Sequence, residues 1–180
     1  MPETTGHNRS IFIGFKGSLD THRLRKKLRE ALHDVAVGVY ILGSNDDSLE
    51  YWQLLSTSKF ALVLRGHVSF SYRFSEVVCS GAVPVLISDD WVVPFSEVFP
   101  FEHYGIRTLE VNALQMVSVL KAISEEKIAQ LSHNAQRFCH QHIITPWQQF
   151  DTLMDIALTR PTNKKICKQF WTVDSSIRRD

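Results

Sequence analysis

Arg73 and Glu76, in the segment Ser-Tyr-Arg-Phe-Ser-Glu at residues 71–76, are the side chains best spaced to do chemistry. The segment precedes an apolar run and has the pattern of a helix start, so Arg73 is predicted to lie in the first turn. A cation there is disfavoured by about 0.3–1 kcal/mol, because a helix N-terminus already carries partial positive charge. On a helical wheel of about 100° per residue, Arg73 and Glu76 share a narrow polar stripe beside the apolar face.

Two interpretations of this spacing remain open. The first is a weak intrahelical ion pair between residues i and i+3. In the second, Arg73 binds a phosphate and Glu76 accepts hydrogen bonds from sugar hydroxyls.

Two further loops offer groups that could bind a ligand. Residues 14–17 read Gly-Phe-Lys-Gly between a short apolar strand and a basic helix. Glycines let a phosphate approach the backbone, and Lys16 adds charge, although a plain strand–helix turn is the simpler explanation. Asp89 and Asp90 follow another apolar strand. Consecutive side chains diverge, so local hydrogen bonding is favoured over metal binding.

The elements that must position these residues alternate between strands and helices. Strands are predicted at 11–13, 37–42, 60–64 and 83–87, with an edge-like strand at 106–111. Helices are predicted to start at Asp20 or Thr21, over about 48–56, and around Arg73. Such alternation predicts an α/β fold, a Rossmann-like parallel sheet with helices on both faces, in which ligands bind beyond the carboxyl ends of the strands.

The apolar faces of the longer helices follow from periodicity. The first helix is predicted to bury Leu24, Leu28, Ala31, Leu32 and Val35. A helix capped by Ser124 carries the stripe Ile128, Leu131, Ala135 and Phe138. A last helix, beginning after Pro146, is predicted to face inward with Trp147, Phe150, Leu153, Met154 and Ala157.

Composition excludes several classes of protein. The 180 residues carry 20 basic and 19 acidic side chains, a formal net charge of +1, which argues against a nucleic-acid partner or a polybasic membrane protein. The sequence contains neither an apolar run of the ~20 residues that cross a bilayer nor a signal-peptide pattern, so we expect no membrane span and no secretion signal in this chain. Its three cysteines are far apart and odd in number, which predicts buried or inert thiols and neither a zinc site nor a disulfide framework.

Three motifs in order resemble the C-terminal half of the exostosin glycosyltransferase family. They are SKFALVLRG at residues 58–66, SYRFSEVVCSGAVPVLISDDW at residues 71–91 and VPFSEV at residues 93–98. The resemblance is close over about residues 50–110 and looser across 10–158. It implies a GT-B enzyme in which residues 1–160 form the lobe that binds a nucleotide-sugar donor and residues 161–180 form a tail.

The resemblance also implies roles for residues of this chain. Arg73 would hold the donor diphosphate and Glu76 the ribose or sugar of the donor. The remaining donor-binding residues would be Arg65, Ser71, Tyr72, Lys16, Gly17 and Asp90. Transfer in this family is inverting and generally needs no metal cofactor, the donor is a nucleoside diphosphate sugar such as a UDP-sugar, and the setting is the Golgi or another secretory-pathway membrane.

The chain departs from the family pattern at two places near its motifs and in the segments that accompany them. Leu64 stands where members usually have proline before the arginine, and residues 67–70 are bulky where members have a small, flexible stretch. The expected N-terminal acceptor lobe and membrane anchor have no counterpart, and no general base is identified. The alternative hypothesis is therefore a non-catalytic nucleotide-sugar-binding or partner subunit, or a truncated fragment, which could form a homo- or hetero-oligomer.

Overall fold

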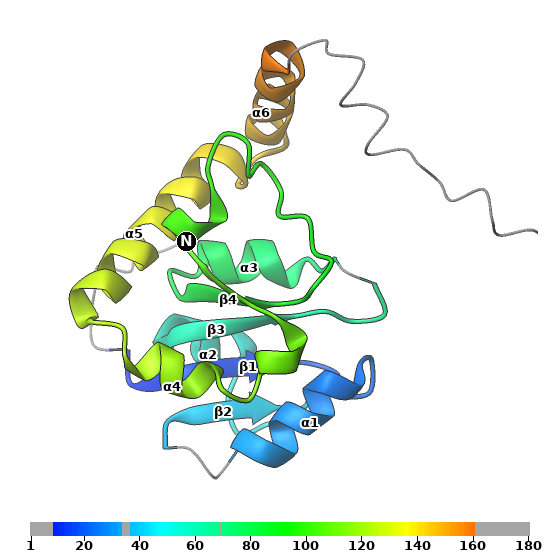
Figure 1. Cartoon of the computed structure of the whole chain (residues 1–180), viewed down its shortest axis with the longest axis vertical. Helices are drawn as coiled ribbons and strands as arrows, with labels where there is room; N and C mark the ends of the chain where they lie inside the picture. Colours follow the sequence, from blue (N-terminus) through cyan, green and yellow to red (C-terminus); the bar gives the residue numbers. More distant parts are fainter. Residues whose placement is uncertain (1–8, 34–36, 69, 161–180) are drawn as a thin grey trace, which may run out of the picture.

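A computed structural model describes residues 9–33, 37–68 and 70–160 of the chain. Its centre is one five-stranded sheet in the order β2-β1-β3-β4-β5, with every neighbouring pair parallel (Figure 1). The strands are β1 (Ile11–Lys16), β2 (Val39–Leu42), β3 (Ser58–Leu64), β4 (Val83–Ile87) and β5 (Ile106–Thr108). The α/β fold with a parallel, Rossmann-like sheet is confirmed.

Both faces of the sheet are buried, as the two-sided apolar strands predict. In β3, Phe60, Leu62 and Leu64 join one core cluster, whereas Ala61 and Val63 join the other. Helices α1 (Arg23–Leu32) and α4 (Met116–Lys121) cover the first face. Helices α2 (Tyr51–Thr57) and α3 (Arg73–Cys79) cover the second (Figure 1).

Several predicted boundaries shift by a few residues. His22, and neither Asp20 nor Thr21, caps α1, because its Nδ1 accepts the backbone N–H of Leu24. The last strand ends at Thr108, since a 3₁₀ helix, η2 (Glu110–Asn112), follows directly; another, η1 (Phe101–His103), precedes β5. The sequence patterns did not predict α4. Val35, placed on the apolar face of the first helix, lies outside the described residues, as does the tail 161–180.

The helix α5 (Glu125–His142) matches its prediction closely. Ser124 caps it by accepting the backbone N–H of Lys127, and all four residues of its predicted stripe are buried. The N-terminal half of this stripe packs in the first core cluster and the C-terminal half in the second.

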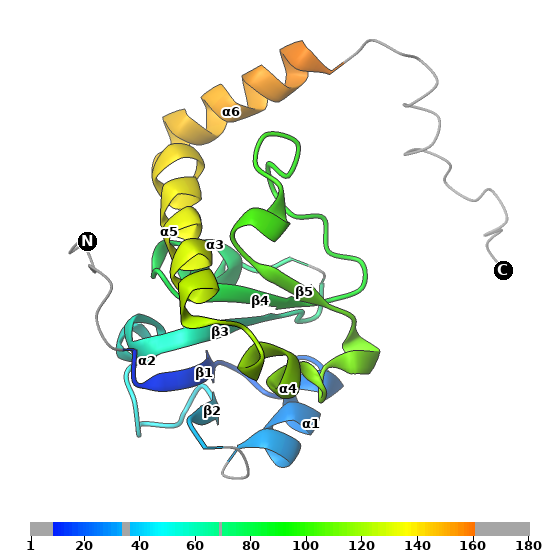
Figure 2. The same ribbon diagram turned by 60° about the vertical axis from the view of Figure 1, so that its left-hand side comes forward.

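The predicted inward face of α6 (Pro146–Thr159) is wrong. Trp147 is 77 % exposed and Phe150 is 54 % exposed, whereas the buried residues are Thr152 and Ile156. The helix extends away from the sheet and continues from the end of α5 (Figure 2). Periodicity identified an apolar face, but it could not show that no sheet surface lies opposite.

Cys79 and Cys139 form a disulfide, which corrects the prediction of inert thiols. Cys79 ends α3 and Cys139 lies near the end of α5, and these two helices pack side by side. The two cysteines are 60 positions apart in sequence. Only the packing of the helices brings them together, so spacing gave no sign of the bond.

Candidate functional site

Arg73 is the first residue of α3, at the carboxyl end of the sheet, as predicted. Its backbone N–H is accepted by the Ser71 hydroxyl at 3.2 Å. The guanidinium extends toward two aromatic rings, with its carbon 4.7 Å from the ring centre of Phe15 and 5.2 Å from that of Tyr51. Phe15 comes from β1 and Tyr51 from α2, so three elements surround this cation. Both ring contacts are cation–π interactions.

The Arg73 guanidinium uses few of its hydrogen-bonding groups. Nη1 lies 3.4 Å from the Tyr51 hydroxyl, a long hydrogen bond, and the buried Nε has no hydrogen-bond partner among the described residues. A guanidinium has five N–H donors. Gly17 leaves space for this side chain, because a Cβ at position 17 would lie 2.5 Å from Arg73 Nη2. The predicted glycine loop and the predicted arginine therefore meet in space.

A second arginine, which is buried, lies at the same corner. Arg25, from α1, donates to the carbonyls of Ser18, Leu64 and Arg65, each at 2.9 Å, and its guanidinium carbon is 5.3 Å from the centre of the Phe15 ring. Burial, with a further contribution from the charge of Arg73, lowers the pKa of Arg25 to about 10. Arg25 thus remains charged at neutral pH, and the two guanidiniums together give this corner a positive potential that favours an anion.

Glu76 does not use Arg73 as a partner. Its Oε2 accepts a short hydrogen bond from the Tyr51 hydroxyl, and the described residues show no ion pair between Glu76 and Arg73. The intrahelical pair considered from the spacing is therefore not formed. Instead Tyr51 lies between the two groups and contacts both.

The other predicted site residues are more scattered. Lys16 donates to the Leu49 carbonyl at 2.7 Å, and the neighbouring Phe15 points to the opposite face of the strand. Arg65 Nη1 is 3.5 Å from a carboxylate oxygen of Glu110. Tyr72 and Asp90 are exposed in the loops before α3 and after β4. The structure thus brings together Arg73, Glu76 and Gly17, while the side chains of Lys16 and Arg65 have protein partners.

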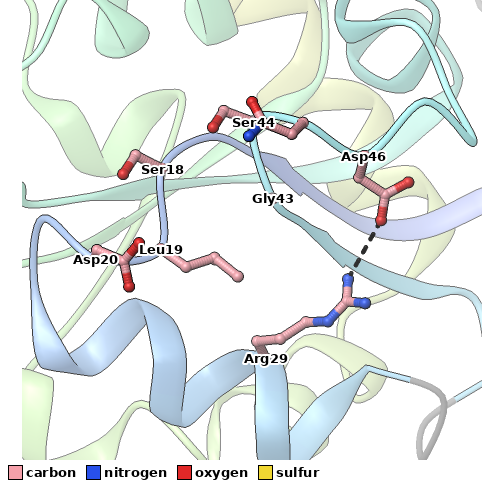
Figure 3. Close-up of a pocket in the computed structure, with 8 residues that line it drawn as sticks. Ser18, Leu19, Asp20, Arg29, Gly43, Ser44 and Asp46 are labelled. Atoms are coloured by element: carbon pink, nitrogen blue, oxygen red, sulfur yellow. Dashed lines mark ion pairs between the residues drawn. The ribbon is translucent and has the colours of Figure 1, made fainter.

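A polar pocket lies next to the glycine loop and is lined in part by Ser18, the residue after Gly17. Its volume is about 430 Å³, and it is formed by the loops after β1 and β2, at the same edge of the sheet (Figure 3). Small-molecule sites commonly measure about 300–1,000 Å³. Its lining residues are Ser18, Leu19, Asp20, Arg29, Gly43, Ser44, Asn45 and Asp46.

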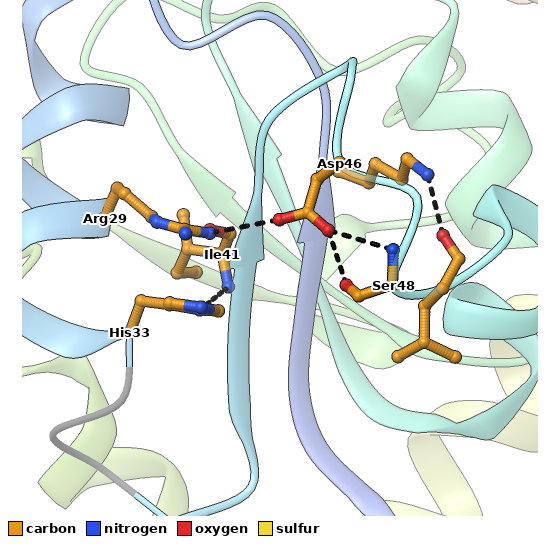
Figure 4. A network of polar contacts seen from close by, with 7 residues as sticks. Arg29, His33, Ile41, Asp46 and Ser48 are labelled. Atoms are coloured by element: carbon orange, nitrogen blue, oxygen red, sulfur yellow. Dashed lines mark hydrogen bonds and ion pairs between the residues drawn. The ribbon is translucent and has the colours of Figure 1, made fainter.

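Two charged groups of this pocket, Arg29 and Asp46, are paired with each other. Asp46 accepts hydrogen bonds from the backbone N–H and the hydroxyl of Ser48, and lies 3.7 Å from Arg29 (Figure 4). The bonds from Ser48, followed by the charge of Arg29, lower the pKa of Asp46. The Arg29 guanidinium also donates to the carbonyl of Ile41. Arg29 and Asp46 therefore already have protein partners, whereas Arg73 has few.

Sequence reasoning missed Phe15, Arg25 and Tyr51. Phe15 lies inside the glycine loop at residues 14–17, so the sequence could have indicated an aromatic ring at the candidate anion site. Arg25 and Tyr51 belong to helices α1 and α2, and no local pattern connects them with Arg73. Only the sheet topology places the ends of these helices at one corner.

An open parallel sheet with a glycine loop and two arginines beyond its strand ends defines an α/β domain of the Rossmann-like class. The exostosin GT47 domain matches residues 1–123, more than half of the chain. The chain belongs to this exostosin family, as its motifs indicated.

Individual relatives agree with this assignment. The chain is 35% identical over 118 residues to an exostosin-1 homolog of Caenorhabditis elegans, covering 66% of this chain and 31% of the relative. It is 31% identical over 107 residues to a probable glycosyltransferase of Arabidopsis thaliana, covering 58% and 23%. It is 36% identical over 90 residues to exostosin-1b of Danio rerio, covering 50% and 12%. The chain therefore spans less than a third of each of these relatives.

None of the helices within residues 9–160 that the structure describes combines the length and apolar character of a bilayer span.

Proposed function

We propose that this domain is the donor-binding lobe of a GT-B glycosyltransferase, which holds a nucleoside diphosphate sugar for inverting transfer to a sugar acceptor. Membership in the exostosin family supports glycosyl transfer as the reaction class. The chain spans less than a third of each of these relatives, which supports the assignment of one lobe and not of a whole two-lobed enzyme.

The observation that carries the proposal is the Arg73 corner. Two guanidiniums contact one Phe15 ring, and Gly17 leaves room for the Arg73 side chain. Among the described residues, Arg73 keeps most of its side-chain donors free of protein partners. Such a fork of donors matches the oxygens of a phosphate, as it matches those of a carboxylate. We therefore assign the donor diphosphate to Arg73, and the buried Arg25 adds positive charge near the same Phe15 ring.

The remaining donor contacts follow from the positions of the neighbouring groups. Glu76 would accept hydrogen bonds from the ribose or sugar hydroxyls, and Lys16, Gly17, Arg65, Ser71, Tyr72 and Asp90 would complete the binding surface. The polar pocket beyond Gly17 offers hydroxyl, amide and carboxylate groups to the part of the donor that extends from the diphosphate. In this proposal the arginines balance the diphosphate charge, so the transfer requires no metal cofactor.

Two features support a setting in the secretory pathway and contact with a partner. Disulfides persist in oxidising compartments such as that pathway, and Cys79–Cys139 is one. We therefore propose a Golgi or related location, as the family resemblance implies. The exposed apolar side chains of α6 favour contact with a further lobe or subunit, and a glycan is the proposed acceptor.

Calorimetric titration of UDP into Arg73→Ala tests the donor site. Loss of a bidentate, charge-assisted contact of about 1.5–3 kcal/mol should weaken UDP binding about ten- to a hundredfold. Arg137→Ala, which removes an exposed arginine on α5, is the matched control and should bind like the unaltered chain. Unchanged affinity in Arg73→Ala would contradict the assignment.

A turnover assay on the same protein separates the two hypotheses of function. Transfer or hydrolysis of a UDP-sugar by this chain supports an active lobe. Binding without turnover supports the subunit alternative, in which the acceptor site and the general base come from elsewhere.

A further inference from the structure

We propose that Tyr51 is a positioning residue for the donor site, because its hydroxyl keeps the Glu76 carboxylate from neutralising Arg73. This inference rests on the proposed function, in which Arg73 receives a diphosphate. No sequence motif pointed to Tyr51, which is the first residue of α2, on a different helix from both of its partners.

The geometry places Tyr51 between the two groups. Its hydroxyl donates to Glu76 Oε2 and accepts from Arg73 Nη1 at 3.4 Å, while its ring lies 5.2 Å from the Arg73 guanidinium carbon. The hydroxyl uses its one proton in the hydrogen bond to the carboxylate, and an oxygen lone pair accepts the hydrogen bond from the guanidinium. The hydrogen bonds therefore run in one direction, from Arg73 to the Tyr51 hydroxyl and from that hydroxyl to Glu76.

The chemistry of the hydroxyl suits this role over the physiological pH range. Burial raises the pKa of Tyr51 above its ordinary value, and the bond to Glu76 raises it further, although the charge of Arg73 acts in the opposite direction. The phenol therefore stays protonated and remains a donor to Glu76. Its neighbour Trp52 packs edge-on against the Tyr51 ring at 5.2 Å, which restricts the movement of that ring.

Removal of the hydroxyl would free Glu76 to turn toward Arg73. The two residues lie at positions i and i+3 of α3, a spacing at which opposite charges pair on a helix. A carboxylate on the guanidinium would occupy the donors that the phosphate needs. Tyr51→Phe should therefore weaken anion binding, although Tyr51 itself does not contact the anion.

Inorganic pyrophosphate is the probe, because it has no sugar hydroxyls and so does not depend on Glu76 as a ligand. By isothermal calorimetry we expect Tyr51→Phe to bind pyrophosphate about two- to fivefold more weakly than the unaltered chain, the size of a partly exposed ion pair. The double variant Tyr51→Phe with Glu76→Gln should recover the original affinity, because a neutral amide does not compete. Because Glu76→Gln alone removes a negative charge near the anion, it is the reference for the double variant, and the two should bind pyrophosphate equally. A merely structural role for Tyr51 would leave the double variant weaker than Glu76→Gln.

Controls separate this inference from the function on which it rests. Tyr40→Phe removes the hydroxyl of a tyrosine on β2 and should leave pyrophosphate binding unchanged. If Arg73→Ala does not weaken pyrophosphate binding, the donor site itself is wrong. If Arg73→Ala weakens it but Tyr51→Phe does not, or if the double variant stays weak, only the role of Tyr51 is overturned. Thermal melts of each variant confirm that it is folded.

Discussion

The bond between Cys79 and Cys139 should be a major contribution to the stability of this domain. It joins the end of α3, the helix that begins with Arg73, to the end of α5. Cys139 is buried, and its helix packs in the same core cluster as α3. The perturbation is reduction of this single bond, either by dithiothreitol or by the paired substitution Cys79→Ala with Cys139→Ala.

The magnitude follows from the length of chain that the bond closes. The two cysteines are 60 positions apart. In the chain-entropy description, cross-linking a loop of this length destabilises the unfolded chain by about 4 kcal/mol at 25 °C. Domains are commonly stable by only about 5–15 kcal/mol, so reduction would remove a large part of the free energy of unfolding.

Urea denaturation followed by circular dichroism measures this effect. With a slope of about 2 kcal/mol per molar urea, a loss of about 4 kcal/mol shifts the midpoint down by about 2 M. The paired alanine variant should show a low midpoint that reductant does not change further. A thiol titration of the unfolded, unreduced chain should find one reactive thiol, since three cysteines less the bonded pair leave Cys167.

Cys167→Ala is the matched control. It should keep the full response to reductant and lower the thiol count from one to zero. A midpoint that moves by less than about 0.5 M on reduction would show that the bond contributes little to stability. Three reactive thiols in protein made under oxidising conditions would show that the bond does not form.

Two further predictions concern the glycine loop and the last helix. Gly17→Ala places a methyl group 2.5 Å from Arg73 Nη2, so we expect UDP to bind about tenfold more weakly by calorimetry, whereas the control Arg137→Ala on α5 should bind normally. On α6, Leu153→Lys should change the urea-derived free energy of unfolding by less than about 0.5 kcal/mol because Leu153 is 55 % exposed, while Ile156→Lys at a 7 % exposed position should cost more than about 2 kcal/mol. Equal losses from the two lysine variants would mean that α6 is packed on its other face in solution.

The sequence alone determined the fold class and the location of the candidate site. Runs such as Phe60–Leu64, apolar at every position, predict strands buried on both faces, and their alternation with helices predicts a parallel sheet. Ligand sites of such sheets lie beyond the strand ends, which drew attention to Gly17 and Arg73. Each of these inferences uses residues close together in the chain, where periodicity and turn chemistry carry the information.

The tertiary structure decided every feature that joins distant parts of the chain. It placed Tyr51 between Arg73 and Glu76, stacked Arg25 and Arg73 on Phe15, and left the apolar face of α6 exposed. The disulfide belongs to the same group, because its cysteines meet only where α3 packs on α5. A local pattern shows which face of an element is apolar or charged, but its neighbour across space is selected by the packing of the whole chain.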